Sequence, residues 1–182
     1  MAAVEAIVAV GWAVFWLYWL IAAFSTKKGH TPWSGARSIR LVISVVAIIV
    51  IRAGVFRGHG LNTDPWRAAV GLVLFALGLG FAIWARVNIG ANWGTPMTEK
   101  DDPELVTTGA YRLVRHPIYS GILLAGVGTA FALSWLWLIA VALAGWYFVY
   151  SATAEERYMT QRFPDTYPAY RRTSKMLVPF VF

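Results

Sequence analysis

The sequence contains no cysteine, and it is poor in charged residues, especially acidic ones. Only 14% of its 182 residues are charged, with nine acidic and sixteen basic side chains. The lack of cysteine excludes disulfide bonds, thiolate nucleophiles and thiolate metal sites. His30, His59 and His116 are scattered without the spacing of metal ligands, so no zinc site is expected. The scarcity of charge also argues against a water-soluble fold.

Apolar residues make up 58% of the chain, which includes ten tryptophans. A surface of this composition would aggregate in water, so lipid is the expected solvent. In lipid, the backbone polar groups of a segment must be satisfied internally, which favours helices. We therefore predict an all-α integral membrane protein with about five transmembrane helices, folded as a single membrane domain over residues 1–182.

Five apolar segments define the predicted spans. The first, 3–24, is longer than a signal-peptide core and carries only Glu5 as a charge. The others are 39–55, 66–87, a segment that begins near 118 and one that ends near 153. The last two are predicted to form a helical hairpin that turns at Ser134 and Trp135, rather than one bent re-entrant unit. Residues 1–87 then hold three spans, and 88–182 hold the hairpin and a C-terminal segment.

The basic residues are distributed unevenly between the connections. The first and third connections and the C-terminal tail hold thirteen of the sixteen, and the fourth connection holds none. Because basic loops stay in the cytoplasm, the N-terminus is predicted outside and the C-terminus inside. The net charge of +7 then reflects cytoplasmic loops and contact with anionic membrane lipids. No basic stripe is interleaved with aromatic residues, so no nucleic-acid partner is expected.

The fourth span begins with Arg-His-Pro-Ile-Tyr-Ser-Gly, from position 115. Pro117 suits the first turn of a helix, which places Arg115 and His116 just before it. Free backbone N–H groups and the helix dipole favour an anion at that point. With Tyr119, these side chains could hold a carboxylate or a phosphate. Spacing alone equally supports a basic membrane anchor with an interfacial tyrosine.

Glu155 and Glu156 stand where the last apolar span runs out. Neighbouring side chains on a helix point about 100° apart, so at most one of the two is expected to face inward easily. Carboxylates near a membrane interior need partners and often mark ligand sites, and a cationic ligand would fit here. A solvated helix end is the alternative, and it is the usual state of a charge run.

Two further patterns carry less information. The turn 105–111 reads Leu-Val-Thr-Thr-Gly-Ala-Tyr, and its small residues could bring backbone amides close to a ligand, although a surface turn has the same composition. Small residues on the third and fourth spans are expected to allow close helix packing. They are Gly71, Gly78, Gly80, Gly121, Ala125, Gly126, Gly128 and Thr129.

These motifs occur in one order along the chain. Leu-Val-Thr-x-Gly-x-Tyr is followed by Arg-His-Pro-x-Tyr-x-Gly, the glutamate pair, then Phe163, Tyr167, Tyr170 and Leu-Val-Pro from 177. The series closely resembles the isoprenylcysteine carboxyl methyltransferase (ICMT-like) family of integral membrane enzymes, and phospholipid methyltransferases share a looser version. The resemblance covers about 84–182, whereas the first two spans carry no family signal.

The resemblance implies an enzyme that uses S-adenosylmethionine, releases S-adenosylhomocysteine and methylates a lipophilic small molecule or lipid that enters from the bilayer. It also implies a cytoplasm-facing pocket built by the last helices and the C-terminal segment, without a metal. The implied catalytic residues are Arg115 and Glu156. The implied cofactor-binding residues are Leu105, Val106, Thr108, Gly109, Tyr111, His116, Pro117, Tyr119, Glu155 and Glu156. Charge supports this assignment, because the cofactor's amino group needs a carboxylate and its carboxylate needs Arg or His.

One segment departs from the family. Members that act on prenylated cysteine carry an arginine in the turn before the glutamate pair, where this chain reads Tyr-Ser-Ala-Thr-Ala from 150 to 154. Either Arg157 or an arginine of the tail replaces it, or the acceptor is not a prenylcysteine carboxylate. Two alternatives therefore stay open: methylation of a phospholipid or other lipid amine on nitrogen, and a non-enzymatic membrane binding protein of the same fold.

Overall fold

The computed structural model describes residues 2–30 and 62–182. Its long helices are α1 (Ala2–Ala22), α3 (Pro65–Ile89), α4 (Pro117–Ala132) and α5 (Trp137–Arg162), and the short α6 (Tyr167–Thr173) follows. Within the described ranges, three helices (α1, α3 and α5) are long and apolar enough to cross a membrane, and α4 is a shorter apolar helix. The predicted span 39–55 lies outside the described residues.

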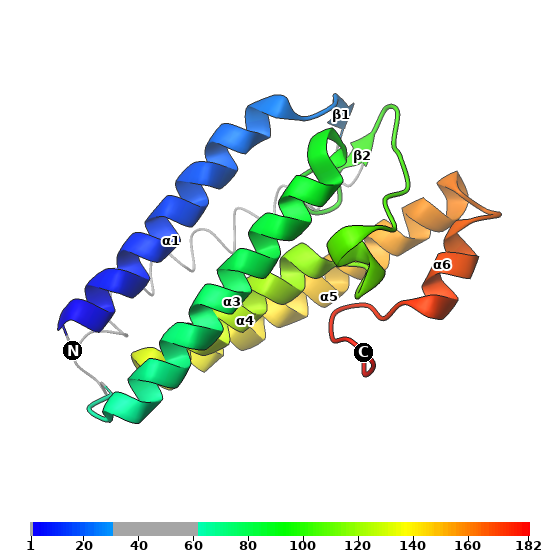
Figure 1. The fold of residues 1–182 in the computed structure, drawn as a ribbon. Coiled ribbons are helices and arrows are strands. Elements are labelled where there is room, and N and C mark those ends of the chain that lie inside the picture. Colours follow the sequence, from blue (N-terminus) through cyan, green and yellow to red (C-terminus); the bar gives the residue numbers. More distant parts are fainter. Residues whose placement is uncertain (1, 31–61) are drawn as a thin grey trace.

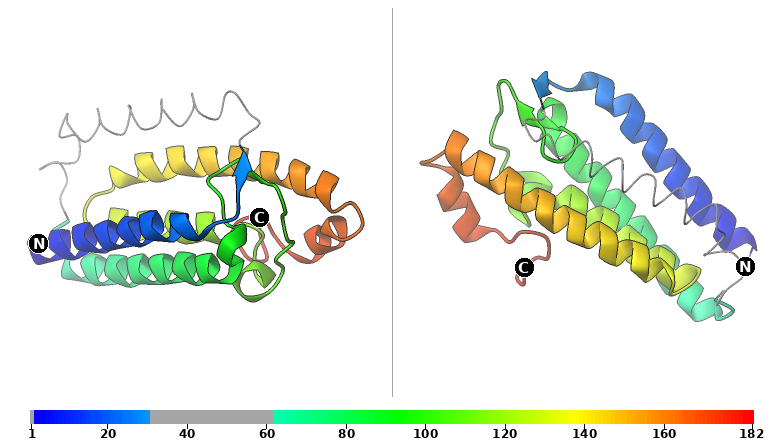
Figure 2. Two further views of the ribbon diagram at one scale, coloured as in Figure 1. Left: turned by 90° about the horizontal axis from the view of Figure 1, so that it is seen from above. Right: turned by 180° about the vertical axis from the view of Figure 1, so that it is seen from behind.

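The four long helices run side by side, and the remaining elements gather at one end of them (Figures 1 and 2). The N-terminus and the start of α3 lie at the opposite end. Two short strands, β1 (Gly29–His30) and β2 (Glu99–Lys100), pair antiparallel with Gly29 opposite Lys100. This small ladder is an addition to the all-α prediction. Three 3₁₀ turns complete the fold: η1 (Ala23–Ser25), η2 (Gly90–Asn92) and η3 (Gly109–Arg112).

Glycines on α3 and α4 bring these two helices into backbone contact. A Cβ at Gly71 would collide with the backbone of Ala132, and one at Gly78 would collide with the backbone nitrogen of Ala125. Gly121 on α4 faces the backbone of α3 just as closely. The predicted close packing is confirmed for these positions, since small residues allow such an approach. Gly80 is different, because a Cβ there would meet no atom within 4 Å.

The predicted hairpin turn is confirmed, but the predicted end of the last span is wrong. α4 ends at Ala132 and α5 begins at Trp137, so Ser134 and Trp135 lie in the connection. α5 does not end near 153; it continues to Arg162. The polar residues after 153 are compatible with a helix, and the first strong barrier is Pro164, which disfavours helical backbone in the residue before it. The glutamate pair therefore lies about two turns inside the helix.

Arg86 connects the end of α1 to the end of α3 through hydrogen bonds. Its guanidinium donates hydrogen bonds of 2.6 Å to the carbonyl of Ala22 and 2.7 Å to that of Gly90. Arg86 is buried in the last turn of α3. The thirteen basic residues that were used to predict orientation include Arg86 as part of the third connection. That assignment to a loop is wrong, because Arg86 belongs to α3 and its side chain is bonded inside the fold.

Candidate functional site

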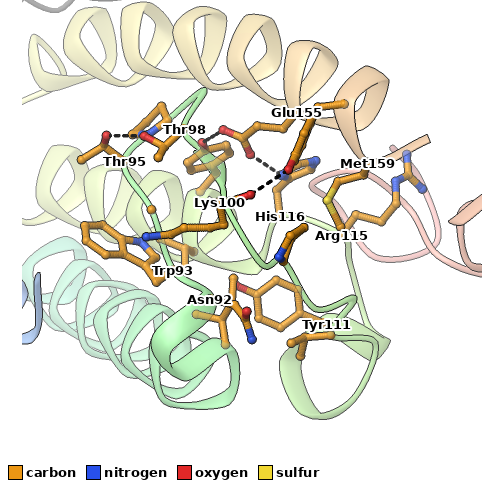
Figure 3. Close-up of a pocket in the computed structure, with 18 of the residues that line it drawn as sticks. Asn92, Trp93, Thr95, Thr98, Lys100, Tyr111, Arg115, His116, Glu155 and Met159 are labelled. Carbon is orange, nitrogen blue, oxygen red and sulfur yellow. Dashed lines mark hydrogen bonds and ion pairs between the residues drawn. The ribbon is translucent and has the colours of Figure 1, made fainter. Parts of the chain in front are cut away.

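A cavity of about 340 Å³ lies at the end of the bundle that carries the β ladder and α6. Its size falls within the range of about 300–1,000 Å³ typical of small-molecule sites. Its polar wall includes Arg115, His116, Tyr119, Glu155 and Tyr170. Its apolar wall includes Trp16, Trp19, Ile118, Ile122 and Phe148. The same cavity is thus lined both by charged groups and by apolar residues of the long helices. Figure 3 shows the cavity with Arg115, His116 and Glu155 labelled.

The motif at 115–117 forms the start of α4, as the sequence predicts. His116 is the residue before the first helical turn, and Pro117 occupies that turn. The N–H groups of the two residues before the helix are used within the protein. The N–H of Arg115 donates to the carbonyl of Lys175 at 2.8 Å, and that of His116 donates to the carbonyl of Met176 at 3.1 Å. The C-terminal segment therefore runs beside the start of α4 and is bonded to it.

His116 stands between the two glutamates. Its Nδ1 lies 3.4 Å from Glu155 Oε2, and its Nε2 lies 3.5 Å from Glu156 Oε1. The expectation that at most one glutamate faces inward is confirmed for the cavity, which Glu155 lines and Glu156 does not. His116 nevertheless contacts both carboxylates, because an imidazole carries nitrogens on two sides. Burial lowers the pKa of His116, but attraction to the two carboxylates outweighs it and raises the pKa above its ordinary value.

Glu155 is held from two further directions. Its Oε1 accepts hydrogen bonds from the Tyr119 hydroxyl at 2.6 Å and from the backbone N–H of Met97 at 2.9 Å. The Tyr119 ring lies stacked between His116 and Phe148, at centroid distances of 5.5 and 4.4 Å. These contacts fix the carboxylate at the cavity wall, and the bond from Met97 ties the loop 93–98 to it.

Glu156 forms a buried ion pair with Arg115. Arg115 Nε donates to Glu156 Oε1 at 2.7 Å, and the two side chains are only 8% and 5% exposed. Arg115 Nη1 also donates to the carbonyl of Ser174, and Arg171 Nε lies 3.4 Å from the second oxygen of Glu156. Arg115 lines the cavity, whereas Glu156 does not. The pair thus joins α4, α5 and the C-terminal segment behind the cavity wall.

The turn 105–111 contributes to the cavity in part. Leu105, Val106 and Tyr111 line it. The other residues predicted for the site, Thr108, Gly109 and Pro117, do not. Gly109 has φ +59°, where glycine is unstrained, and it packs on the side chain of Asn88. Asn88 Oδ1 accepts the N–H of Ala110 at 2.9 Å, so this amide is satisfied within the protein and is not offered to a ligand.

Asn88, Met97 and Lys100 are among the residues that contact or support this site and were not singled out from the sequence. Lys100 lines the cavity and is 9% exposed. The only available signal was the length of the polar stretch 88–117, which predicts a functional loop without naming its residues. Arg157, one candidate to replace the missing family arginine, is exposed and does not line the cavity.

Comparison with known proteins finds a matching family and relatives of similar sequence. Residues 66–166 match the family described as PEMT, phospholipid methyltransferase. Over 148 residues the chain is 31% identical to protein-S-isoprenylcysteine O-methyltransferase B of Arabidopsis thaliana, which covers 79% of this chain and 74% of that protein. It is 30% identical over 140 residues to the nickel-cobalt-cadmium resistance protein NccN of Alcaligenes xylosoxydans xylosoxydans. This match covers 74% of this chain and 60% of that protein.

The chain also resembles a solved structure of a membrane methyltransferase. The structure of the eukaryotic intramembrane Ras methyltransferase ICMT, determined without a monobody, superposes with a TM-score of 0.58 at 27% identity, covering 81% of this chain and 53% of that one. The chain therefore spans about half the length of that enzyme. By sequence and by fold, this multi-pass integral membrane protein belongs to the PEMT/ICMT family of membrane methyltransferases, which uses S-adenosylmethionine.

Proposed function

We propose that this protein is an S-adenosylmethionine-dependent methyltransferase whose acceptor is lipophilic. The observation that carries the proposal is a single cavity that both charged and apolar side chains line. Its lining includes the charged groups of Arg115, His116 and Glu155 and the apolar side chains of Trp16, Trp19 and Phe148. A charged metabolite and an apolar acceptor can meet in such a cavity, and bringing two reactants together in the right geometry is itself a large source of catalysis.

The charged wall fits the cofactor's chemistry. Glu155 Oε1 is occupied by Tyr119 and Met97, whereas Oε2 faces only His116 at 3.4 Å among the contacts of the described residues, and the side chain is 25% exposed. That oxygen is suited to accept from an ammonium group. Arg115 and His116 are suited to the cofactor's carboxylate. When bound, the cofactor supplies an electrophilic methyl group on a sulfonium.

The chain's own residues then bind, orient and exclude water. Tyr119, stacked and hydrogen-bonded, keeps Glu155 in place, and we assign Glu156 to positioning because it holds Arg115 from behind the wall. Leu105, Val106 and Tyr111 are apolar neighbours of the cavity suited to a nucleobase. The apolar wall keeps water from the reacting centre, where charge on a cation and an anionic acceptor would be dispersed as they react.

The location of the cavity agrees with the orientation predicted from basic residues. The cavity lies at the same end of the helices as the C-terminal segment, which that orientation places in the cytoplasm, where the cofactor is made available. The acceptor would enter between helices on the α1 side, since Trp16 and Trp19 of α1 belong to the cavity wall.

Calorimetry on the full-length protein in detergent tests cofactor binding with S-adenosylhomocysteine as the probe. Glu155→Gln should weaken affinity by about 10-fold or more, since a hydrogen bond to a charged group contributes about 1.5–3 kcal/mol. Glu104→Gln is the matched control. Glu104 also touches the cavity, but it is exposed and pairs with Lys27, so affinity should change little. Absence of any binding by the wild type would end the proposal.

A transfer assay tests the reaction itself. The protein is incubated with a radiolabelled methyl donor and a native lipid extract, and the labelled product is identified by mass spectrometry. A lipophilic methylated product is expected. Its structure decides whether oxygen, sulfur or nitrogen receives the methyl group, and a wild-type protein that binds the cofactor but labels no lipid would favour a binding role over an enzymatic one.

A further inference from the structure

Lys100 is a buried cation in the cavity wall. It belongs to β2, and only 9% of the residue is exposed. Two glycines leave room for its side chain: a Cβ at Gly29 would lie 3.0 Å from Lys100 Cδ, and one at Gly94 would lie 3.3 Å from Cε. Its Nζ donates to the carbonyl of Lys27 at 2.6 Å. The β ladder and these contacts hold the ammonium group in place.

The other cations around the cavity already have carboxylate partners. Arg115 is paired with Glu156, and His116 lies between both glutamates. Lys27 pairs with Glu104 at 2.6 Å on the rim. None of the ion pairs found between described residues includes Lys100, which has only a carbonyl oxygen as its acceptor there. Lys100 is thus the cation of the cavity wall that these pairs leave without a counter-ion.

The position of Lys100 matters as much as its charge. Figure 3 shows it on the same side of the cavity as Trp93, whereas Arg115 lies on the other side, beyond His116. Trp19, of the apolar wall, packs edge-on against Trp93 at a centroid distance of 5.9 Å. Burial, with repulsion from Arg86, lowers the pKa of Lys100, and attraction to Asp101 opposes this only in part. A buried cation that contacts no carboxylate among the described residues is costly, and charges of this kind near a membrane interior often mark ligand sites.

We propose that Lys100 binds an anionic group of the lipophilic acceptor, so that the acceptor is an amphiphile with a carboxylate or phosphate beside its apolar tail. This inference rests on the proposed function, because it assigns the second ligand of the same cavity. It also supplies, from the loop 93–100, the positive charge that is absent from the segment 150–154.

Binding of matched single-chain amphiphiles tests the assignment. Tritiated palmitate, hexadecyl phosphate and palmitamide share a tail length and differ in headgroup charge. They are bound to full-length protein in one fixed detergent mixture, with S-adenosylhomocysteine present, and measured by scintillation proximity. The wild type should bind at least one anionic probe about 10-fold more tightly than palmitamide, as a charge-assisted hydrogen bond requires. The tighter of the two anions identifies the headgroup class.

Three variants test whether Lys100 causes the preference for an anionic headgroup. Lys100→Met should remove the preference for the anion and leave palmitamide binding unchanged, while Lys100→Arg should retain the preference. Lys28→Met is the matched control, because Lys28 is an exposed lysine next to β1 that does not line the cavity. It should bind all three probes as the wild type does.

The outcomes separate this inference from the proposed function. Failure of the wild type to bind S-adenosylhomocysteine overturns the proposed function. Normal S-adenosylhomocysteine binding with no preference for either anion in the wild type overturns the role of Lys100, and this result needs no variant to fold. A preference that persists in Lys100→Met overturns it as well.

Discussion

Arg115 and Glu156 form a buried ion pair across 41 positions of sequence, with Nε 2.7 Å from Oε1. The pair connects the residue before α4 to the interior of α5. Through the carbonyl of Ser174 it also holds the C-terminal segment. The side chains that face the cavity, His116 and Glu155, are immediate neighbours of this pair in sequence, so the pair determines how they are presented.

Removing one partner of the pair should destabilise the protein strongly. Glu156→Gln leaves Arg115 as a buried charge without its carboxylate, a change that typically costs about 3–5 kcal/mol. We expect a large fall in the melting temperature in detergent, followed by intrinsic fluorescence. Arg115→Met should have a similar effect, because among the described residues it leaves Glu156 with His116 and the more exposed Arg171 as positive partners.

The double variant Arg115→Met/Glu156→Leu is the control for this prediction. Replacing both charges with apolar residues removes the uncompensated charge, and such replacements are often close to neutral. Its melting temperature should lie above that of either single variant. If the three variants lose stability additively, the two side chains do not act as a pair.

His116 should make stability depend on pH. Its pKa is raised in the folded protein by the two carboxylates, in spite of burial, so folding favours the protonated imidazole. The stabilisation is present in full below the unfolded-state pKa of about 6.5 and is lost as the pH rises through the higher folded-state pKa. The melting temperature of the wild type should therefore fall as the pH rises above about 6.5.

The matched measurement uses His116→Gln, which cannot change charge in this range. All other titrating groups, including His30 and His59, are the same in both proteins, so the difference between the two curves isolates His116. We expect the wild type to be the more stable protein at the acidic end and the advantage to shrink toward the alkaline end. An advantage that grows with pH would show that burial dominates and that the imidazole is neutral in the folded protein.

The sequence predicted most of the helices and the order of the site motifs, for identifiable reasons. The apolar runs and Pro117 determine where the helices lie, because length and backbone restrictions act locally. The partners of the backbone at 115–116 were missed, because they come from Lys175 and Met176 in a segment some sixty residues away that carries no local signal. Local rules cannot show that a distant segment accepts the N–H groups of Arg115 and His116.

The same distinction explains what was missed at the glutamate pair. Helical geometry places Glu155 and Glu156 in different directions, which is correct for their Cα–Cβ bonds. It does not foresee that a single imidazole from another element can contact both carboxylates. Lys100 was counted as one loop cation among many, because its burial depends on pairing between β1 and β2, strands of two residues that no periodicity reveals.

Close packing of α3 on α4 predicts opposite effects for two glycines on the same helix. In Gly78→Ala the new methyl group would collide with the backbone of α4, and backbone cannot give way as a flexible side chain can. We expect a loss of about 1–3 kcal/mol, which is typical of overpacking. Gly80→Ala meets open space, so stability should stay constant or rise by up to about 1 kcal/mol. Equal melting temperatures for the two variants would place the helices further apart than the structure does.

The absence of cysteine makes the membrane orientation directly measurable, because each introduced cysteine is the only thiol in the chain. Asp101 is exposed beside the cavity end of the bundle, and Thr63 is exposed at the opposite end, just before α3. If basic loops are retained in the cytoplasm, a membrane-impermeant maleimide should label Asp101→Cys in inside-out vesicles and Thr63→Cys in intact cells. The reverse pattern would place the cavity outside the cell, away from the cytoplasmic supply of the methyl donor, and would remove the support that orientation gives to the proposed function.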